Sequence, residues 1–79
     1  KELWTVDPAK HKPGKVMHGI GWPLNHLPGG ATGGSFLYHL PDNQVSLGLV
    51  VDLSYKNPHL SPFDEMQRWK HHPLIADVL

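Results

Sequence analysis

The chain contains no cysteine among its 79 residues. Disulfide bonds, and zinc or iron–sulfur centres held by cysteine, are therefore excluded within this sequence. An excess of charge of one sign is also missing, because seven Lys and Arg residues balance seven Asp and Glu residues. Nucleic-acid binding normally depends on a basic patch. We therefore expect no nucleic-acid partner.

Long hydrophobic runs are absent as well. The longest, LGLVV at residues 47–51, has the length of a strand, whereas a membrane-spanning helix needs about 20 apolar residues. The chain begins with KELW and ends with LIADVL, inside a helical pattern. We interpret residues 1–79 as one internal segment of a larger protein.

Two apolar stretches predict a β-hairpin. Residues 35–40 and 45–53 flank PDNQ, whose residue types favour a turn. A four-residue loop pairs Leu40 with Val45 and Phe36 with Leu49. Because side chains alternate along a strand, this register gives one apolar face that covers a core: Phe36, Tyr38, Leu40, Val45, Leu47 and Leu49. The opposite, mixed face then holds Leu37, His39, Ser46 and Gly48.

The rest of the chain predicts an α+β fold. Residues 2–6 and 16–22 read as short strands. Ser61 is a suitable helix cap before Pro62, and Asp64 and Glu65 follow in the first turn, where the helix dipole favours them. We therefore expect an antiparallel sheet built on a hairpin at about 35–53, followed by one or two C-terminal helices at about 62–71 and 73–79.

The histidines and serines give no catalytic or metal-binding pattern. Of the seven histidines, only His71 and His72 are close in sequence, and adjacent residues of a helix do not face each other. We therefore predict no metal site. The serines lack a nucleophile-elbow motif, and GGATGG is neither a phosphate loop nor a dinucleotide fingerprint. We predict no catalytic side chain and no flavin site here.

Gly33 and Gly34 stand at the entrance of the predicted strand 35–40. Without a Cβ, glycine allows a ligand to approach the backbone amide and carbonyl directly. Backbone groups often orient ligands in largely apolar pockets. A plain turn leading into the strand explains the same residues, so composition alone leaves both interpretations open.

Four longer strings carry a family resemblance. They are GWPL at 21–24, GGSFLYHL at 33–40, LGLVV at 47–51 and YKNPHLSPFDEMQRWKHHP at 55–73. Together they resemble the electron transfer flavoprotein–ubiquinone oxidoreductases, in order and spacing, over nearly the whole chain. Complete members of that family are several times longer.

The resemblance implies a place in an oxidoreductase of the electron-transport chain. Members pass electrons from reduced electron transfer flavoprotein through FAD and a 4Fe-4S cluster to ubiquinone. They do so peripherally on a membrane, the bacterial cytoplasmic membrane or the mitochondrial inner membrane. The matching segment is part of the ubiquinone-binding domain, and the glycine pair near the quinone corresponds to Gly33 and Gly34. FAD and the cluster are implied for the whole protein, not for this segment, so we predict that the isolated chain is inactive.

The alternative is a structural or interaction module. In that interpretation the hairpin and helices support the flavin domain and bind no ligand of their own. Both interpretations are compatible with the sequence, since they concern different faces of the sheet.

Overall fold

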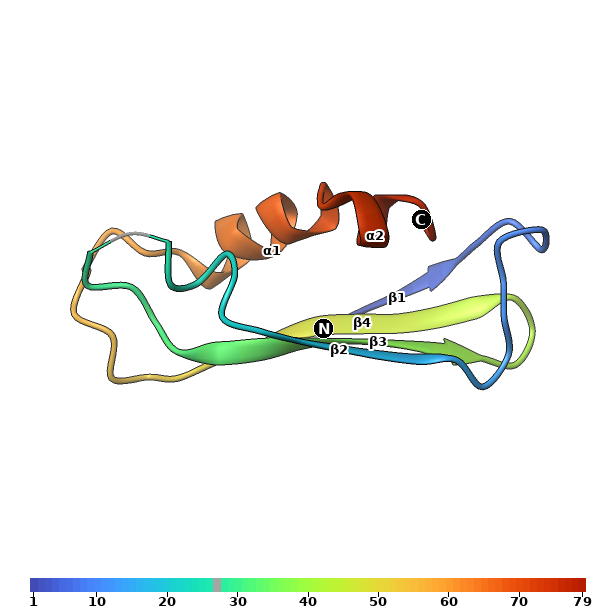
Figure 1. Ribbon diagram of the computed structural model, residues 1–79, viewed down its shortest axis with the longest axis horizontal. Helices are drawn as coiled ribbons and strands as arrows, with labels where there is room; N and C mark the ends of the chain where they lie inside the picture. Colours follow the sequence, from blue (N-terminus) through green and yellow to red (C-terminus); the bar gives the residue numbers. More distant parts are fainter. Residues whose placement is uncertain (27) are drawn as a thin grey trace.

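The computed structural model describes residues 1–26 and 28–79, which form a sheet and two short helices. The strands are β1 (Glu2–Thr5), β2 (Val16–Ile20), β3 (Gly33–Leu40) and β4 (Gln44–Val51), and the helices are α1 (Pro62–Lys70) and α2 (Pro73–Ala76). The sheet is antiparallel throughout, in the order β1-β4-β3-β2. Both helices lie on one side of it (Figure 1). The predicted α+β class, with a sheet followed by C-terminal helices, is confirmed.

The predicted hairpin register is wrong by one residue. The loop holds three residues, 41–43, and Leu40 lies opposite Gln44 rather than Val45. Asp42 and Asn43 adopt left-handed backbone conformations, with φ of 63° and 59°. Asp and Asn tolerate this region better than other non-glycine residues. The two consecutive left-handed residues shorten the turn and shift β3 by one position against β4.

A one-residue shift moves every side chain of a strand to the other face. Leu37 pairs with Leu47 and His39 pairs with Val45, and all four side chains are buried. The core-facing set on β4 was predicted correctly. On β3 it was not: Phe36, Tyr38 and Leu40 share the opposite face.

The outward position of Phe36 has a packing reason. Its ring covers Gly48 on the neighbouring strand, where an added Cβ would lie 2.8 Å from the ring. Tyr38 packs against Phe36 with ring centroids 5.1 Å apart. Around these aromatic rings the outer face carries exposed aliphatic side chains: Leu3, Val16, Ile20 and Val50. The helices leave this face open (Figure 1).

Helix α1 begins where the sequence predicted. The Ser61 side chain accepts a hydrogen bond from the Asp64 amide at 3.3 Å, and Pro62 occupies the first turn. Met66 and Trp69 are buried against the sheet, whereas Phe63 is exposed. Helix α2 ends at Ala76, earlier than predicted, and its Ile75 enters the same core.

A salt bridge fixes α1 to the edge of the sheet. Lys70 Nζ lies 2.9 Å from a carboxylate oxygen of Glu2 on β1. The indole of Trp4 donates to the same oxygen at 2.8 Å. Both hydrogen bonds lower the pKa of the Glu2 carboxyl, and the bond from Trp4 has the larger effect. The helical layer is thereby held over the inner face of the sheet.

His39 is a buried polar residue within this core. Its Nδ1 accepts a hydrogen bond from the Lys12 amide at 3.1 Å, so the neutral ring carries its proton on Nε2. Nε2 has no hydrogen-bond partner among residues 1–26 and 28–79. Burial lowers the pKa of His39, and electrostatic interactions with His11, Lys15 and Lys12 lower it further.

We expect the chain to lose stability in mild acid through His39. Its folded-state pKa lies below the unfolded value of about 6.5, so the unfolded chain binds more protons as the pH falls below that value. The stability that neutral His39 contributes is fully present above about pH 6.5 and is lost as the pH falls toward the folded pKa. The free energy of unfolding then falls by at most about 1.4 kcal/mol per pH unit. Urea unfolding of the wild type and of His39→Leu at pH 8, 6 and 5 measures this.

The Leu variant should lose less stability than the wild type between pH 8 and pH 5. The exposed Lys12 can donate its amide to water in that variant. Equal losses in the two proteins would show that His39 is not the titrating group.

Candidate functional site

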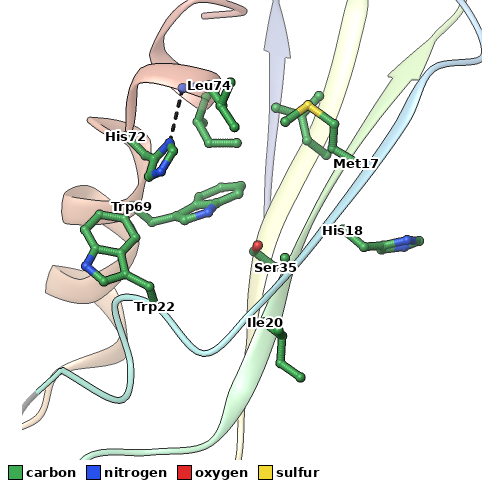
Figure 2. Close-up of a pocket in the computed structure, with 11 residues that line it drawn as sticks. Met17, His18, Ile20, Trp22, Ser35, Trp69, His72 and Leu74 are labelled. Atoms are coloured by element: carbon green, nitrogen blue, oxygen red, sulfur yellow. Dashed lines mark hydrogen bonds between the residues drawn. The ribbon is translucent and has the colours of Figure 1, made fainter.

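A cavity of about 200 Å³ lies between the helices and the β2–β3 side of the sheet. Its lining is mostly apolar: Met17, Leu37, Trp69, Leu74 and Ile75. Figure 2 shows Trp22, Trp69 and His72 on the helical side and Ser35 on the sheet side. Typical ligand pockets measure about 300–1,000 Å³. This cavity is smaller than that range, so it has room for a single ring at most, with any longer chain left outside.

Ser35 places a hydroxyl at the sheet wall. It lies opposite Gly19 on β2, and a Cβ on Gly19 would stand only 2.4 Å from the Ser35 Oγ. Glycine at position 19 therefore leaves the space that this hydroxyl occupies. No hydrogen bond joins the Ser35 hydroxyl to residues 1–26 or 28–79. It is free to serve as donor or acceptor.

His72 places an imidazole at the helical wall. Its Nδ1 accepts a hydrogen bond from the Leu74 amide at 3.2 Å, which caps α2. The ring packs edge-on against Trp22, with centroids 5.4 Å apart. Figure 2 shows the ring between Leu74 and the two tryptophans. From the sequence, His72 was evaluated only as a metal ligand, so its place at this wall was not predicted.

Gly33 lies on the core side of β3, where the neighbouring atoms leave no room for a side chain. Its φ is 154°, and a Cβ there would lie 1.9 Å from the Val50 carbonyl oxygen and 2.9 Å from Leu24. Its own carbonyl accepts a hydrogen bond from the Gly21 amide at 3.0 Å. The residue is only partly exposed, so Leu24 and β4 already occupy its inner side.

Gly34 faces the open side of the sheet. It lies between Ile20 and Val50 on the neighbouring strands, both of which are exposed. A Cβ at this position would lie 2.8 Å from the Gly19 carbonyl oxygen. The structure thus places Gly33 and Gly34 inside β3 rather than before it. They lie beside the cavity, which begins at the next residue, Ser35.

A second cavity of about 390 Å³ lies between β4 and the start of α1. Its walls include Leu49, Phe63 and Met66. The carboxylate of Glu2 lines it but is already bonded to Trp4 and Lys70. We place the candidate site in the first cavity, which offers uncommitted polar groups and adjoins the glycine pair.

The described titratable side chains form no cluster that could bind a metal ion. Within residues 1–26 and 28–79, no three His, Asp or Glu side chains lie close enough to hold a metal ion. In the same part of the chain, neither helix has the length and apolar character needed to cross a membrane.

Comparisons with known proteins identify the family. The family described as "ETF-QO, ubiquinone-binding" matches residues 1–79. The electron transfer flavoprotein–ubiquinone oxidoreductase of Pseudomonas aeruginosa is 65% identical over 79 residues. The chain belongs to this family. It also shares 66% identity with the probable oxidoreductase of this type from Acinetobacter baylyi and 57%, over 81 aligned residues, with the human mitochondrial one.

The match confirms the predicted resemblance to the electron transfer flavoprotein–ubiquinone oxidoreductases. In each of these alignments the whole chain is covered, but it spans only 14% of the Pseudomonas protein and 13% of the human one. The relatives from Arabidopsis thaliana and human are named as mitochondrial. No solved structure matches the chain.

Proposed function

We propose that this segment supplies part of the ubiquinone site of an electron transfer flavoprotein–ubiquinone oxidoreductase. The observation that carries the proposal is the match of a ubiquinone-binding family over residues 1–79. In the whole protein, electrons from reduced electron transfer flavoprotein pass through FAD and a 4Fe-4S cluster to ubiquinone at a membrane surface. The segment forms part of the ubiquinone-binding domain.

The residues present fit the quinone but not the other two groups. The chain has no cysteine to hold a cluster and no glycine fingerprint for FAD. A quinone headgroup is a flat ring with two carbonyl acceptors, and the cavity combines apolar walls with the Ser35 hydroxyl and the His72 ring. In this proposal the ring occupies the cavity beside the β3 segment that begins with Gly33 and Gly34, and the isoprenoid chain remains outside.

The expected result is that a short-chain quinone binds at the inner face. Titrating the 79-residue chain with ubiquinone-1 should shift the amide resonances of residues 33–35 together with the indole resonance of Trp69 and the amide of Ile75. Cofactor-free chain should not reduce the quinone, since the redox chemistry belongs to bound cofactors.

Two outcomes would contradict the placement. Shifts at Leu3, Ser46 and Val50 instead of Trp69 and Ile75 would move the ligand to the open outer face. No shift at any resonance would favour the alternative function. Substitution of Gly34 is a poor test, because any Cβ meets the Gly19 carbonyl oxygen and disturbs the sheet whether or not a ligand binds.

The alternative, a module that supports a neighbouring domain, is favoured by the open sheet face. Ile20 and Val50, which flank Gly34 on the neighbouring strands, are 91% and 62% exposed there, and exposed apolar patches commonly mark an interface. Leu3 is 60% exposed on the same face. Ligand binding on the inner face and domain packing on the outer face are compatible.

A further inference from the structure

The two nitrogens of the His72 ring have different environments. Nδ1 accepts the Leu74 amide proton at 3.2 Å and therefore carries no proton of its own. The neutral ring then holds its proton on Nε2. Within residues 1–26 and 28–79, the His72 ring forms a hydrogen bond only through Nδ1, and His72 lines the cavity. The cap on α2 thus leaves one ring N–H available as a donor.

Neighbouring residues restrict the rotation of the His72 ring. Trp22 packs edge-on against the imidazole at 5.4 Å, and Pro73 begins α2 immediately after His72. The Leu74 bond holds the ring from the other side, as Figure 2 shows. A donor with a set direction needs little further ordering when a ligand binds, and lost rotamer freedom is one of the main costs of binding.

We infer that His72 is a headgroup-binding residue, whose Nε2–H donates a hydrogen bond to a carbonyl oxygen of the quinone. The inference rests on the proposed function and adds a residue to it. Ser35 contributes a second polar group, a hydroxyl, from the opposite wall. A quinone carbonyl accepts hydrogen bonds and cannot donate them, so a ring nitrogen that carries a proton matches it and an unprotonated nitrogen does not.

Two substitutions at His72 test the roles of the two ring nitrogens separately. In His72→Asn the side-chain oxygen takes the place of Nδ1, and Asn is among the best helix caps, but the group corresponding to Nε2–H is lost. In His72→Gln the amide nitrogen reaches the place of Nε2, whereas the cap on Leu74 is lost. His71→Asn is the matched control, since the exposed His71 does not line the cavity.

The experiment measures KM for ubiquinone-1 and the melting temperature in the full-length oxidoreductase that carries this segment. His72→Asn should raise KM roughly 2- to 10-fold, as expected for one lost neutral hydrogen bond, with the melting temperature unchanged. His72→Gln should keep KM within 2-fold and lower the melting temperature. His71→Asn should change neither quantity.

The remaining outcomes overturn the inference. If His72→Asn leaves KM unchanged while ubiquinone-1 still shifts the Trp69 and Ile75 resonances of the 79-residue chain, the quinone binds without His72. If Asn and Gln raise KM equally and both lower the melting temperature, His72 acts only through the fold of α2. Absence of resonance shifts would instead contradict the proposed function itself.

Discussion

Gly33→Ala should destabilise the chain by at least about 3 kcal/mol. The new Cβ would lie 1.9 Å from the Val50 carbonyl oxygen, a main-chain atom of the adjacent strand that no side-chain rotation can move. The φ of 154° adds backbone strain, since non-glycine residues in such regions cost about 1–3 kcal/mol. Small domains have only about 5–15 kcal/mol of stability in total. The shift of the urea midpoint measures the loss.

Gly14→Ala is the matched control for this prediction. Gly14 also has a positive φ, of 83°, but a Cβ there meets nothing within 4 Å. Its cost should therefore be limited to left-handed strain of about 1–2 kcal/mol. Equal losses in the two variants would mean that β3 and β4 separate easily at Val50, and that the close approach contributes nothing.

The glycine pair shows what sequence reasoning can establish and what it cannot. Two glycines at the start of a strand left a turn and a close approach to the backbone as open interpretations. The sequence could not distinguish a ligand from a neighbouring strand as the approaching group. In the structure, Val50 approaches Gly33 and Gly19 approaches Gly34. The presence of glycine is thus explained by sheet packing, and the contact with quinone has to be tested independently.

Local signals predicted the helices and strands well, whereas the hairpin register depended on a turn geometry that the sequence did not determine. The Ser61–Pro62 start of α1 depends on adjacent residues, so it was readable from the sequence. The hairpin register depended on whether Asp42 and Asn43 both adopt positive φ, and the residue types permit either loop length. Hydrophobicity then misled, because Phe36 is large and apolar yet covers Gly48 on the outer face.

The cavity could not be predicted because its walls come from distant segments. Ser35 and His72 are 37 positions apart along the printed sequence, and nothing local connects them. One signal was present: a histidine directly before Pro73 stands at a helix cap position. That position would have indicated that one ring nitrogen is used by the backbone.

Trp69 belongs both to the core and to the cavity wall. Its replacement, like that of Gly33, should therefore cause a large loss of stability. Its side chain is 4% exposed, belongs to the main core cluster and lines the cavity. Removing a buried tryptophan side chain typically costs about 3–5 kcal/mol. Trp69→Ala should therefore unfold much of the population at 37 °C, which loss of amide dispersion in a solution spectrum would show.

Trp69→Phe separates packing from ligand contact. Phenylalanine keeps an aromatic ring in the core cluster that includes Met66 and Ile75, so the variant should fold with a smaller loss, below about 3 kcal/mol. It also enlarges the cavity beside His72, and a quinone ring held there would lose contacts with the missing half of the indole. We expect folded Trp69→Phe to bind ubiquinone-1 several-fold more weakly than the wild type. Unchanged affinity in a variant with dispersed amide resonances would place the quinone away from Trp69 and hence outside this cavity.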